Sequence, residues 1–206
     1  MKLTLIRHAE SEANAGYATS DPADISLTEL GKRQAIELAQ QFNEPPDLII
    51  VTSYKRTQQT AQPLIEKFPL TPVEVWPLHE FTFLSPASCK NTTVQDRLPM
   101  VQQYWERCDP FFVHGEGAES FEQFSKRVAE SMNVLTRLNK GDVLAFTHGQ
   151  VMRLLLQFEH VGCQDLLGGM RYFRDIMLGF EIPNLGVKFR ELEKVNLRTA
   201  FSQFFK

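Results

Sequence analysis

The sequence predicts an α/β fold, a three-layer α/β/α sandwich with a mostly parallel central sheet and an inserted cap. Short apolar, β-prone runs alternate along the chain with longer segments of helical periodicity. The runs are mostly apolar and do not alternate strictly with polar residues, as in strands that are buried on both faces. One irregular stretch, residues 81–118, carries Pro86, Pro99 and Pro110 and interrupts the alternation. We expect residues 1–206 to form one domain with 81–118 as its cap or lid, because 206 residues suffice for one substantial core.

The part of the chain before the cap predicts three strands and two helices. The run KLTLI at 2–6 is the first strand, and a helix follows over 26–42, where Ser26 and Glu29 fit a capping box. The remaining expected elements here are a strand at 47–53, a helix at 56–68 and a short strand at 73–76.

The cap and the part after it predict further helices and strands. A helix is expected around 94–107 inside the cap, and a strongly periodic helix over 120–138, with Ser120 as its N-cap and Gln123 three residues on. The remaining expected elements are a strand at 142–148, a helix at 150–158 and two strands at 177–182 and 187–192.

Composition excludes several classes of function. The formal net charge of −3 gives no global attraction to nucleic acid or to an anionic membrane surface. The three cysteines (Cys89, Cys108 and Cys163) are widely spaced and form no CxxC pair, so neither a zinc knuckle nor a disulfide framework is indicated. The apolar run at the start is too short for a signal peptide or a membrane span, and we expect a cytoplasmic protein.

Two of the predicted strands end on a histidine, and both histidines follow apolar runs. His8 comes directly after Arg7 at the end of the first strand, and His148 is the last residue of the strand at 142–148. Arg56 lies just beyond the strand at 47–53. Ligands of α/β sheets bind beyond the carboxyl ends of the strands, so these ends predict one shared crevice.

Two histidines and two arginines in one crevice suit phosphoryl chemistry. A guanidinium group presents a planar fork that matches phosphate oxygens and stays charged. A neutral imidazole is a competent nucleophile toward phosphorus, and nearby guanidiniums stabilise the transition-state charge. The start of the helix at Gly149 adds backbone N–H donors, and Ser11 and Asn14 add side-chain donors. A leaving alkoxide also needs a proton from a carboxylic acid.

Six segments carry a resemblance to the histidine phosphatase (phosphoglycerate mutase-like) superfamily, in the order and at the spacings of that family. The stretch Leu5 to Asn14 resembles its RHG signature, although Ala9 and Ala13 stand where the family usually has glycine and often has tryptophan. The segments that carry the resemblance are LIRHAESEAN, LTELGKRQA, TSYKRTQQTA, LHEF, AESFEQFSKRV and THGQVMR. The resemblance spans most of the chain and is weakest over residues 81–118.

The resemblance implies a role for each matching residue. His8 is similar to the nucleophile that becomes phosphohistidine, and Arg7 and Arg56 to the phosphate clamp. His148 is similar to the second pocket histidine, expected as a cation that binds a phosphoryl oxygen, and Asn14 to an outer donor. Glu80 occupies the position of the proton donor, with rivals at Glu10, Glu12, Glu116 and Glu119; a purely structural role for Glu80, as a cap or strand-end acid, stays open.

These observations predict a metal-independent phosphomonoester hydrolase that works through phosphohistidine on His8, with no cofactor. A phosphoglycerate mutase and a non-catalytic phospho-ligand binding module stay open as alternatives. Hydrolysis is favoured over the mutase because residues 81–118 are rich in phenylalanine and lack a basic, proline-containing insert. The expected partner is a phosphorylated small molecule or a phosphopeptide, with no nucleic acid and no membrane, and the protein is expected as a monomer or homodimer.

Overall fold

The computed structural model describes residues 1–138, 140–160, 165–179, 182–185 and 187–191. Within these ranges, no helix combines the length and the apolar character needed to cross a membrane. Cys89 and Cys108 are free thiols, and Cys163 lies outside the described residues.

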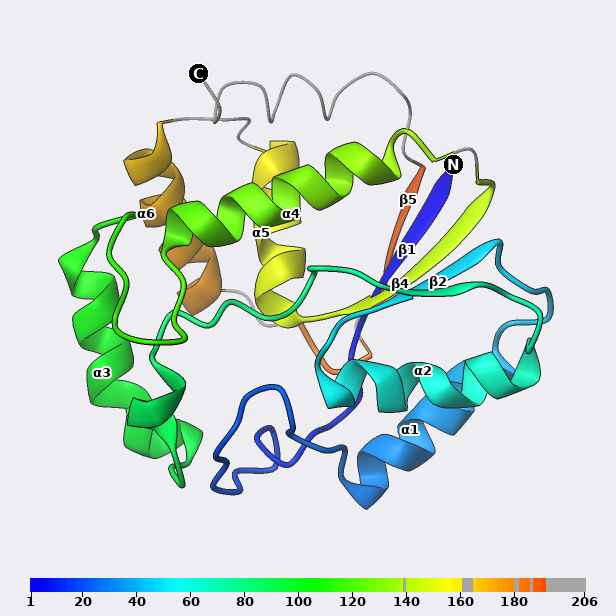
Figure 1. Ribbon diagram of the computed structural model, residues 1–206, viewed down its shortest axis with the longest axis horizontal. Coiled ribbons are helices and arrows are strands. Elements are labelled where there is room, and N and C mark those ends of the chain that lie inside the picture. The colour runs from blue at the N-terminus through cyan, green and yellow to red at the C-terminus, as the bar shows by residue number, and fades with distance from the viewer. Residues whose placement is uncertain (139, 161–164, 180–181, 186, 192–206) are drawn as a thin grey trace.

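Strands and helices alternate along the chain as the sequence predicts, and the strands form one sheet (Figure 1). The sheet has the order β3-β2-β4-β1-β5, in which all neighbours are parallel except β1 and β5, which pair antiparallel. The elements are β1 (Lys2–Arg7), α1 (Glu29–Gln40), β2 (Leu48–Val51), α2 (Lys55–Lys67), β3 (Val73–Val75), a 3-10 turn (Pro86–Cys89), α3 (Val94–Arg107), α4 (Phe121–Leu135), β4 (Asp142–Thr147), α5 (Gly149–His160), α6 (Leu166–Gly179) and β5 (Val187–Glu191).

The apolar strands divide their side chains between two cores, because successive residues of a strand point to opposite faces. Leu3 and Leu5 of β1 belong to the core that holds α4, α5 and α6. Ile6 of the same strand belongs to the core that holds α1 and α2. Figure 1 shows the sheet between these two helical layers, and the predicted three-layer sandwich is therefore confirmed.

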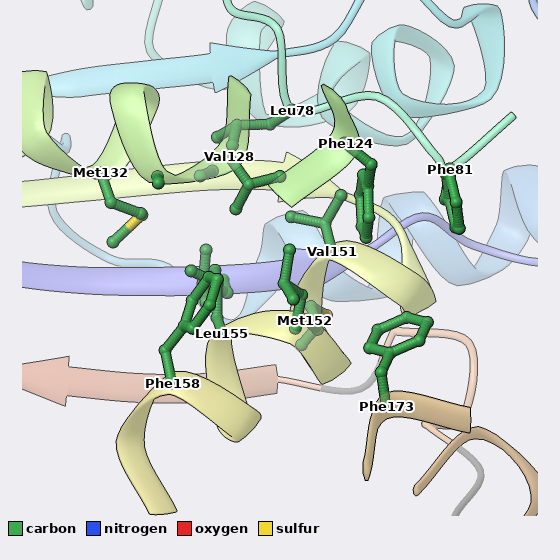
Figure 2. Packing of buried hydrophobic residues seen from close by; sticks show 14 of the residues in the cluster. Leu78, Phe81, Phe124, Val128, Met132, Val151, Met152, Leu155, Phe158 and Phe173 are labelled. Atoms are coloured by element: carbon green, nitrogen blue, oxygen red, sulfur yellow. The ribbon is translucent and has the colours of Figure 1, made fainter. Parts of the chain in front are cut away.

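The larger core lies under α4 and extends into the cap. Figure 2 shows the α4 side chains facing those of α5, with Phe173 of α6 and Phe81 at one end. The rings of Phe81 and Phe124 are stacked, with 4.4 Å between their centroids, and Trp105 of α3 lies 5.9 Å from Phe173. The cap, residues 81–118, is therefore anchored to the main core by aromatic packing.

Two predictions of local structure are wrong. The strand expected at 177–182 is not formed, because Met177 belongs to the last turn of α6, and residues 180 and 181 lie outside the described ranges. The adjacent glycines at 168 and 169 are poor helix formers, so the sequence did not predict helix α6. The helix buries Met170 and Phe173. The helix expected to be capped by Ser26 begins at Glu29 instead, and Thr28 caps it by accepting a hydrogen bond from the backbone N–H of Gly31.

Candidate active site

The predicted strand ends converge at one edge of the sheet. Strands β1 and β4 are neighbours, and Arg7 pairs with Thr147 in their register. His8 and His148 therefore leave the sheet side by side, with 5.2 Å between their ring centroids. Arg56 lies in the first turn of α2, which follows β2 on the other side of β4.

His8 is held as a neutral imidazole with a defined tautomer. Its Nδ1–H donates to the carbonyl oxygen of Ala9 at 2.8 Å, and its Nε2 accepts from Nε–H of Arg56 at 3.1 Å. The side chain is 3% exposed. Burial, followed by the positive charge of Arg56, lowers the pKa of His8 well below the ordinary value of 6.5. The lone pair that could attack an electrophile is therefore on Nε2 at neutral pH.

Arg56 connects the two histidines. Its Nε contacts Nε2 of His8, its NH2 donates to Nδ1 of His148 at 3.1 Å, and its NH1 donates to the carbonyl oxygen of Pro22 at 2.6 Å. The ring of Tyr54 lies 4.8 Å from the guanidinium carbon. Burial lowers the pKa of Arg56 to about 10, so the group still carries its charge at neutral pH.

The placement of His148 corrects the expectation that it is a cation in contact with a phosphoryl oxygen. Because Nδ1 accepts from Arg56, the ring proton is on Nε2, which donates to Oγ1 of Thr52 at 3.0 Å. His148 is 0% exposed, and burial, with Arg56 next, lowers its pKa well below 6.5. The structure therefore presents a neutral ring that lies behind Arg56.

Glu80 is the only one of the five candidate acids that lines the cavity. It lies between two buried apolar residues, Leu78 and Phe81, which fix the local chain. Its Oε1 accepts from the backbone N–H of Gln150 at 3.0 Å, in the first turn of α5. A carboxyl group at a helix N-terminus meets favourable N–H dipoles.

The four rival acids are engaged elsewhere or lie outside the cavity lining. Oε1 of Glu10 accepts from Thr28 at 2.7 Å, at the start of α1. Glu119 forms a bidentate pair with Arg127, with contacts of 2.8 Å and 2.6 Å. Glu12 and Glu116 are exposed. The geometry thus favours Glu80 as the acid that reaches a ligand in this cavity.

The remaining predicted site residues lie around the same place. Arg7 lines the cavity and donates from NH1 to the carbonyl oxygen of Ile182. Oδ1 of Asn14 accepts from the backbone N–H of Ser11 at 3.2 Å and from its Oγ at 2.9 Å. The side-chain amide nitrogen of Asn14 therefore remains available as a hydrogen-bond donor to a ligand. Gly149 opens helix α5 but does not itself line the cavity.

The loop that carries His8 is fixed against helix α1. Gly31 permits this contact, because a Cβ atom there would lie 2.0 Å from the carbonyl oxygen of Glu10. Ala9, where the resembled family usually has glycine, lies outside the positive-φ region, as expected for a tolerated methyl group. Its backbone N–H donates to Oγ1 of Thr60 at 3.0 Å. Helices α1 and α2 thus both position the residue that follows His8.

The cavity above these residues has a volume of about 290 Å³. One wall is supplied by the cap, mostly by apolar side chains that include Phe83, Leu84 and Val101. Arg97 of helix α3 lines the same wall. Ala13, where many members of the resembled family have tryptophan, also lines the cavity, in the loop that follows His8.

Sequence reasoning missed several residues that contact this cluster. Thr52 and Tyr54 follow strand β2 directly and lie next to His148, with 5.2 Å between the Tyr54 and His148 rings. Their position at a strand end, in the stretch TSYKR, was a signal that could have found them. The contact of Arg56 with Pro22, and that of Arg97 in the cavity wall with Thr19, join segments distant in sequence and had no such signal.

Within the described residues, no group of three or more His, Cys, Asp or Glu side chains is arranged to hold a metal ion. The polar side chains that the described residues bring to the cavity are three guanidinium groups, one imidazole, two amides and five hydroxyl groups, together with one carboxyl group. Such a donor set suits oxyanions better than cations.

Comparison with known proteins gives one consistent result. A family profile described as histidine phosphatase superfamily (branch 1) matches residues 3–165. The probable phosphoglycerate mutase GpmB of Yersinia pestis (strain Pestoides F) is 30% identical over 164 residues, which cover 76% of this chain and 73% of that protein.

Solved structures show the same fold. The alpha-ribazole phosphatase of Shigella flexneri superposes with a TM-score of 0.72 at 24% identity, covering 94% of this chain and 91% of the other. The phosphoserine phosphatase of Entamoeba histolytica, in complex with 3-phosphoglyceric acid, gives 0.66 at 23% identity, covering 91% and 89%.

Proposed function

The chain belongs to the histidine phosphatase superfamily (branch 1), whose members are phosphatases or mutases, and from this membership we propose that it is a metal-independent phosphomonoester hydrolase. One observation carries the proposal. Arg56 lies between His8 and His148 at the cavity floor and leaves Nε2 of His8 neutral and nucleophilic. The conclusion concerns the type of reaction, since the natural substrate is a separate question.

The proposed reaction has two steps. Nε2 of His8 forms a bond to phosphorus while the bond from phosphorus to the leaving oxygen breaks, and Glu80 gives its carboxyl proton to that oxygen. Water then forms a bond to phosphorus, the N–P bond breaks and returns its electron pair to His8, and the Glu80 carboxylate takes up the proton of the water. The net result is hydrolysis of a phosphomonoester to an alcohol and phosphate.

The other residues of the site act on charge and position. Arg7 and Arg56 stabilise the equatorial oxygens of the transition state. Asn14 is a further donor to these oxygens. His148 is a positioning residue in this proposal, because it contacts Arg56 and is buried behind it.

Hydrolysis of 4-nitrophenyl phosphate in the presence of EDTA tests the proposal. We expect turnover that EDTA leaves unchanged, and a loss of roughly 10⁴-fold or more in His8→Ala, as for removal of a catalytic nucleophile. His114→Ala, in the cap and outside the cavity lining, is the matched control. An alkali-stable, acid-labile phosphoenzyme should form in the wild type and in His114→Ala, and not in His8→Ala. Turnover that EDTA abolishes, or that survives in His8→Ala, contradicts the mechanism.

A phosphoglycerate mutase is the second candidate, supported by the Yersinia pestis relative, described as a probable phosphoglycerate mutase. A mutase must hold a substrate with phosphate or carboxylate at both ends. Among the described residues, Arg97 is the single cation that the cap contributes to the cavity, and the apolar side chains around it do not match the short polar body of a phosphoglycerate. A coupled assay with 3-phosphoglycerate and 2,3-bisphosphoglycerate distinguishes the two, and substantial mutase turnover overturns hydrolysis as the main activity.

A binding module without turnover is the third candidate. In such a module we expect the carboxyl group at the position of the proton donor to point away from the cavity. Glu80 lines the cavity instead, beside the nucleophile and the arginines, which supports turnover.

A further inference from the structure

The cavity has two chemically different ends. At its floor are His8, Arg56 and Arg7, which the proposed function assigns to the phosphoryl group. The cap covers the other end with apolar side chains, among which Arg97 is the charged exception. A cation on an apolar wall of a ligand cavity costs desolvation, and such groups are commonly matched by a ligand anion.

Arg97 is held in place by three hydrogen bonds. Its Nε donates to Oγ1 of Thr92 at 2.8 Å, and its NH2 donates to the carbonyl oxygen of Thr92 at 2.6 Å and to Oγ1 of Thr19 at 2.7 Å. All three acceptors are neutral. Within the described part of the chain, no hydrogen bond uses NH1. The guanidinium is therefore oriented in advance and keeps a donor for a ligand.

No carboxylate pairs with Arg97 among the described residues. The adjacent acid, Asp96, accepts from the backbone N–H and Oγ1 of Thr93 in the cap of helix α3, at 2.8 Å and 2.7 Å. Two other arginines in or near the cap differ: Arg127 pairs with Glu119, and Arg107 lies 3.9 Å from Asp109. Arg97 thus acts on the Asp96 carboxyl only through space and has no direct carboxylate partner among the described residues on this wall of the cavity.

The sum of the charges that line the cavity agrees with an unpaired positive charge at Arg97. Three arginines and one carboxyl group face it. A phosphoryl dianion balances two of the arginines, and Glu80 must be protonated to act as an acid, so one positive charge remains. A second negative charge on the substrate would neutralise it.

We propose that Arg97 is a specificity-determining residue that binds a second oxyanion, a carboxylate or a second phosphate, on the leaving group of the substrate. The inference rests on the proposed function, because it assumes that the phosphoryl group occupies the floor at His8. The apolar side chains around Arg97 then contact the body of the leaving group. The substrate class is a phosphomonoester with an apolar body and a distal anionic group.

Paired substrates test the proposal. We compare phenyl phosphate with its 3- and 4-carboxy derivatives and with 4-phosphonophenyl phosphate, in the wild type and in Arg97→Gln. The wild type should prefer at least one anionic substrate in kcat/KM, and Arg97→Gln should lose roughly tenfold or more on that substrate, as for a hydrogen bond to a charged group. Turnover of phenyl phosphate should change little. The carboxylate and phosphonate arms distinguish the two sources of the anion.

Matched variants separate recognition from structure. Arg107→Gln removes one positive charge from the same helix, outside the cavity lining, and should leave the preference intact. Arg97 also joins the loop after β1 to the cap through Thr19 and Thr92. A purely structural role would therefore lower turnover of every substrate by the same factor. That result, or a wild type that prefers phenyl phosphate over every anionic substrate, overturns the proposal.

A binding measurement makes the inference independent of turnover. Calorimetry with benzylphosphonate and with its 3- and 4-carboxy and 4-phosphono derivatives, none of which can be hydrolysed, should show tighter binding of at least one anionic analogue by the wild type. Arg97→Gln should lose that difference. If this binding pattern appears while no phosphate ester is hydrolysed, the proposed hydrolase activity is wrong and the proposed anion site at Arg97 is supported. If esters are hydrolysed and all the analogues bind equally, the anion site fails and hydrolysis stands.

Discussion

The floor of the cavity and the cap above it are built in opposite ways. His8 and Arg56 of the floor belong, with Thr52 and His148 behind them, to a buried polar cluster in which each ring nitrogen and each guanidinium nitrogen has a partner. The cap packs through aromatic rings and also exposes apolar residues, with Phe111 68% exposed. A hydrogen bond joins the cap to the stretch after β2, between the hydroxyl groups of Tyr54 and Thr82 at 2.7 Å.

We therefore expect the floor to determine the rate of the reaction and the cap to determine which substrate is bound. A fully paired polar cluster has one low-energy arrangement, so a change in it should affect every substrate alike. An apolar wall tolerates substitution of similar volume, so a change in the cap should alter which substrate is accepted. Variants at the two places should therefore give different patterns across a panel of substrates.

The largest expected effect comes from a change of Arg56 in the floor. Arg56→Lys keeps a charge but cannot contact His8, His148 and Pro22 together, because an ammonium group lacks the planar fork. We expect kcat/KM to fall roughly 100- to 1,000-fold, the range for loss of one preorganised donor, and by a similar factor for all substrates. Arg33→Lys on the exposed face of α1 is the control. A loss restricted to some substrates would show that floor and cap are not separate.

Glu80 lies where floor and cap meet, and its effect should depend on the leaving group. Glu80→Gln keeps an oxygen for the backbone N–H of Gln150 but cannot act as an acid. We expect a loss of roughly 100-fold or more with an alkyl phosphate, which needs a proton on its leaving oxygen. With 4-nitrophenyl phosphate the first step should be nearly unaffected, and single-turnover kinetics can measure it. Equal losses of that step on both substrates would assign Glu80 a structural role.

The smallest expected effect concerns stability, through the two buried histidines of the floor. Both folded pKa values are lowered, so below about pH 6.5 the unfolded chain binds protons that the folded protein does not. The free energy of unfolding should therefore fall as the pH drops from about 6.5 to 5, by about 1.4 kcal/mol per pH unit for each histidine. His148→Asn keeps an acceptor for Arg56 and should remove one such contribution in urea titrations. An unchanged slope in this variant would contradict a neutral, buried His148.

The sequence predicted most of the fold because strand and helix periods differ and the apolar runs are clear. Helix α6 was missed, since Gly168 and Gly169 weaken the local helix signal and only tertiary burial of Met170 and Phe173 reveals it. Strand ends also predicted that His8 and His148 meet, because neighbouring parallel strands end at one edge.

The roles of the individual residues at the site could not be predicted from the sequence in the same way. The resemblance implied a phosphate contact for His148, but its burial behind Arg56 depends on how β2, β4 and α2 pack. Arg97 contacts Thr19, which is 78 residues away in sequence, and no local pattern encodes that contact. The periodicity of the sequence thus predicts elements, whereas pairing between distant loops needs the folded chain.

The position of β1 in the sheet also has a consequence for synthesis. This strand carries the nucleophile at its end, and its neighbours in the sheet are β4 and β5, the two strands made last among those described. Arg7 and its partner Thr147 are 140 residues apart. At 5–20 residues per second, a ribosome needs roughly 7 to 28 s to cover that interval. During this time β1 has both edges unpaired, so the growing chain must keep an apolar strand from aggregating, and the active site forms only after β4 has been made.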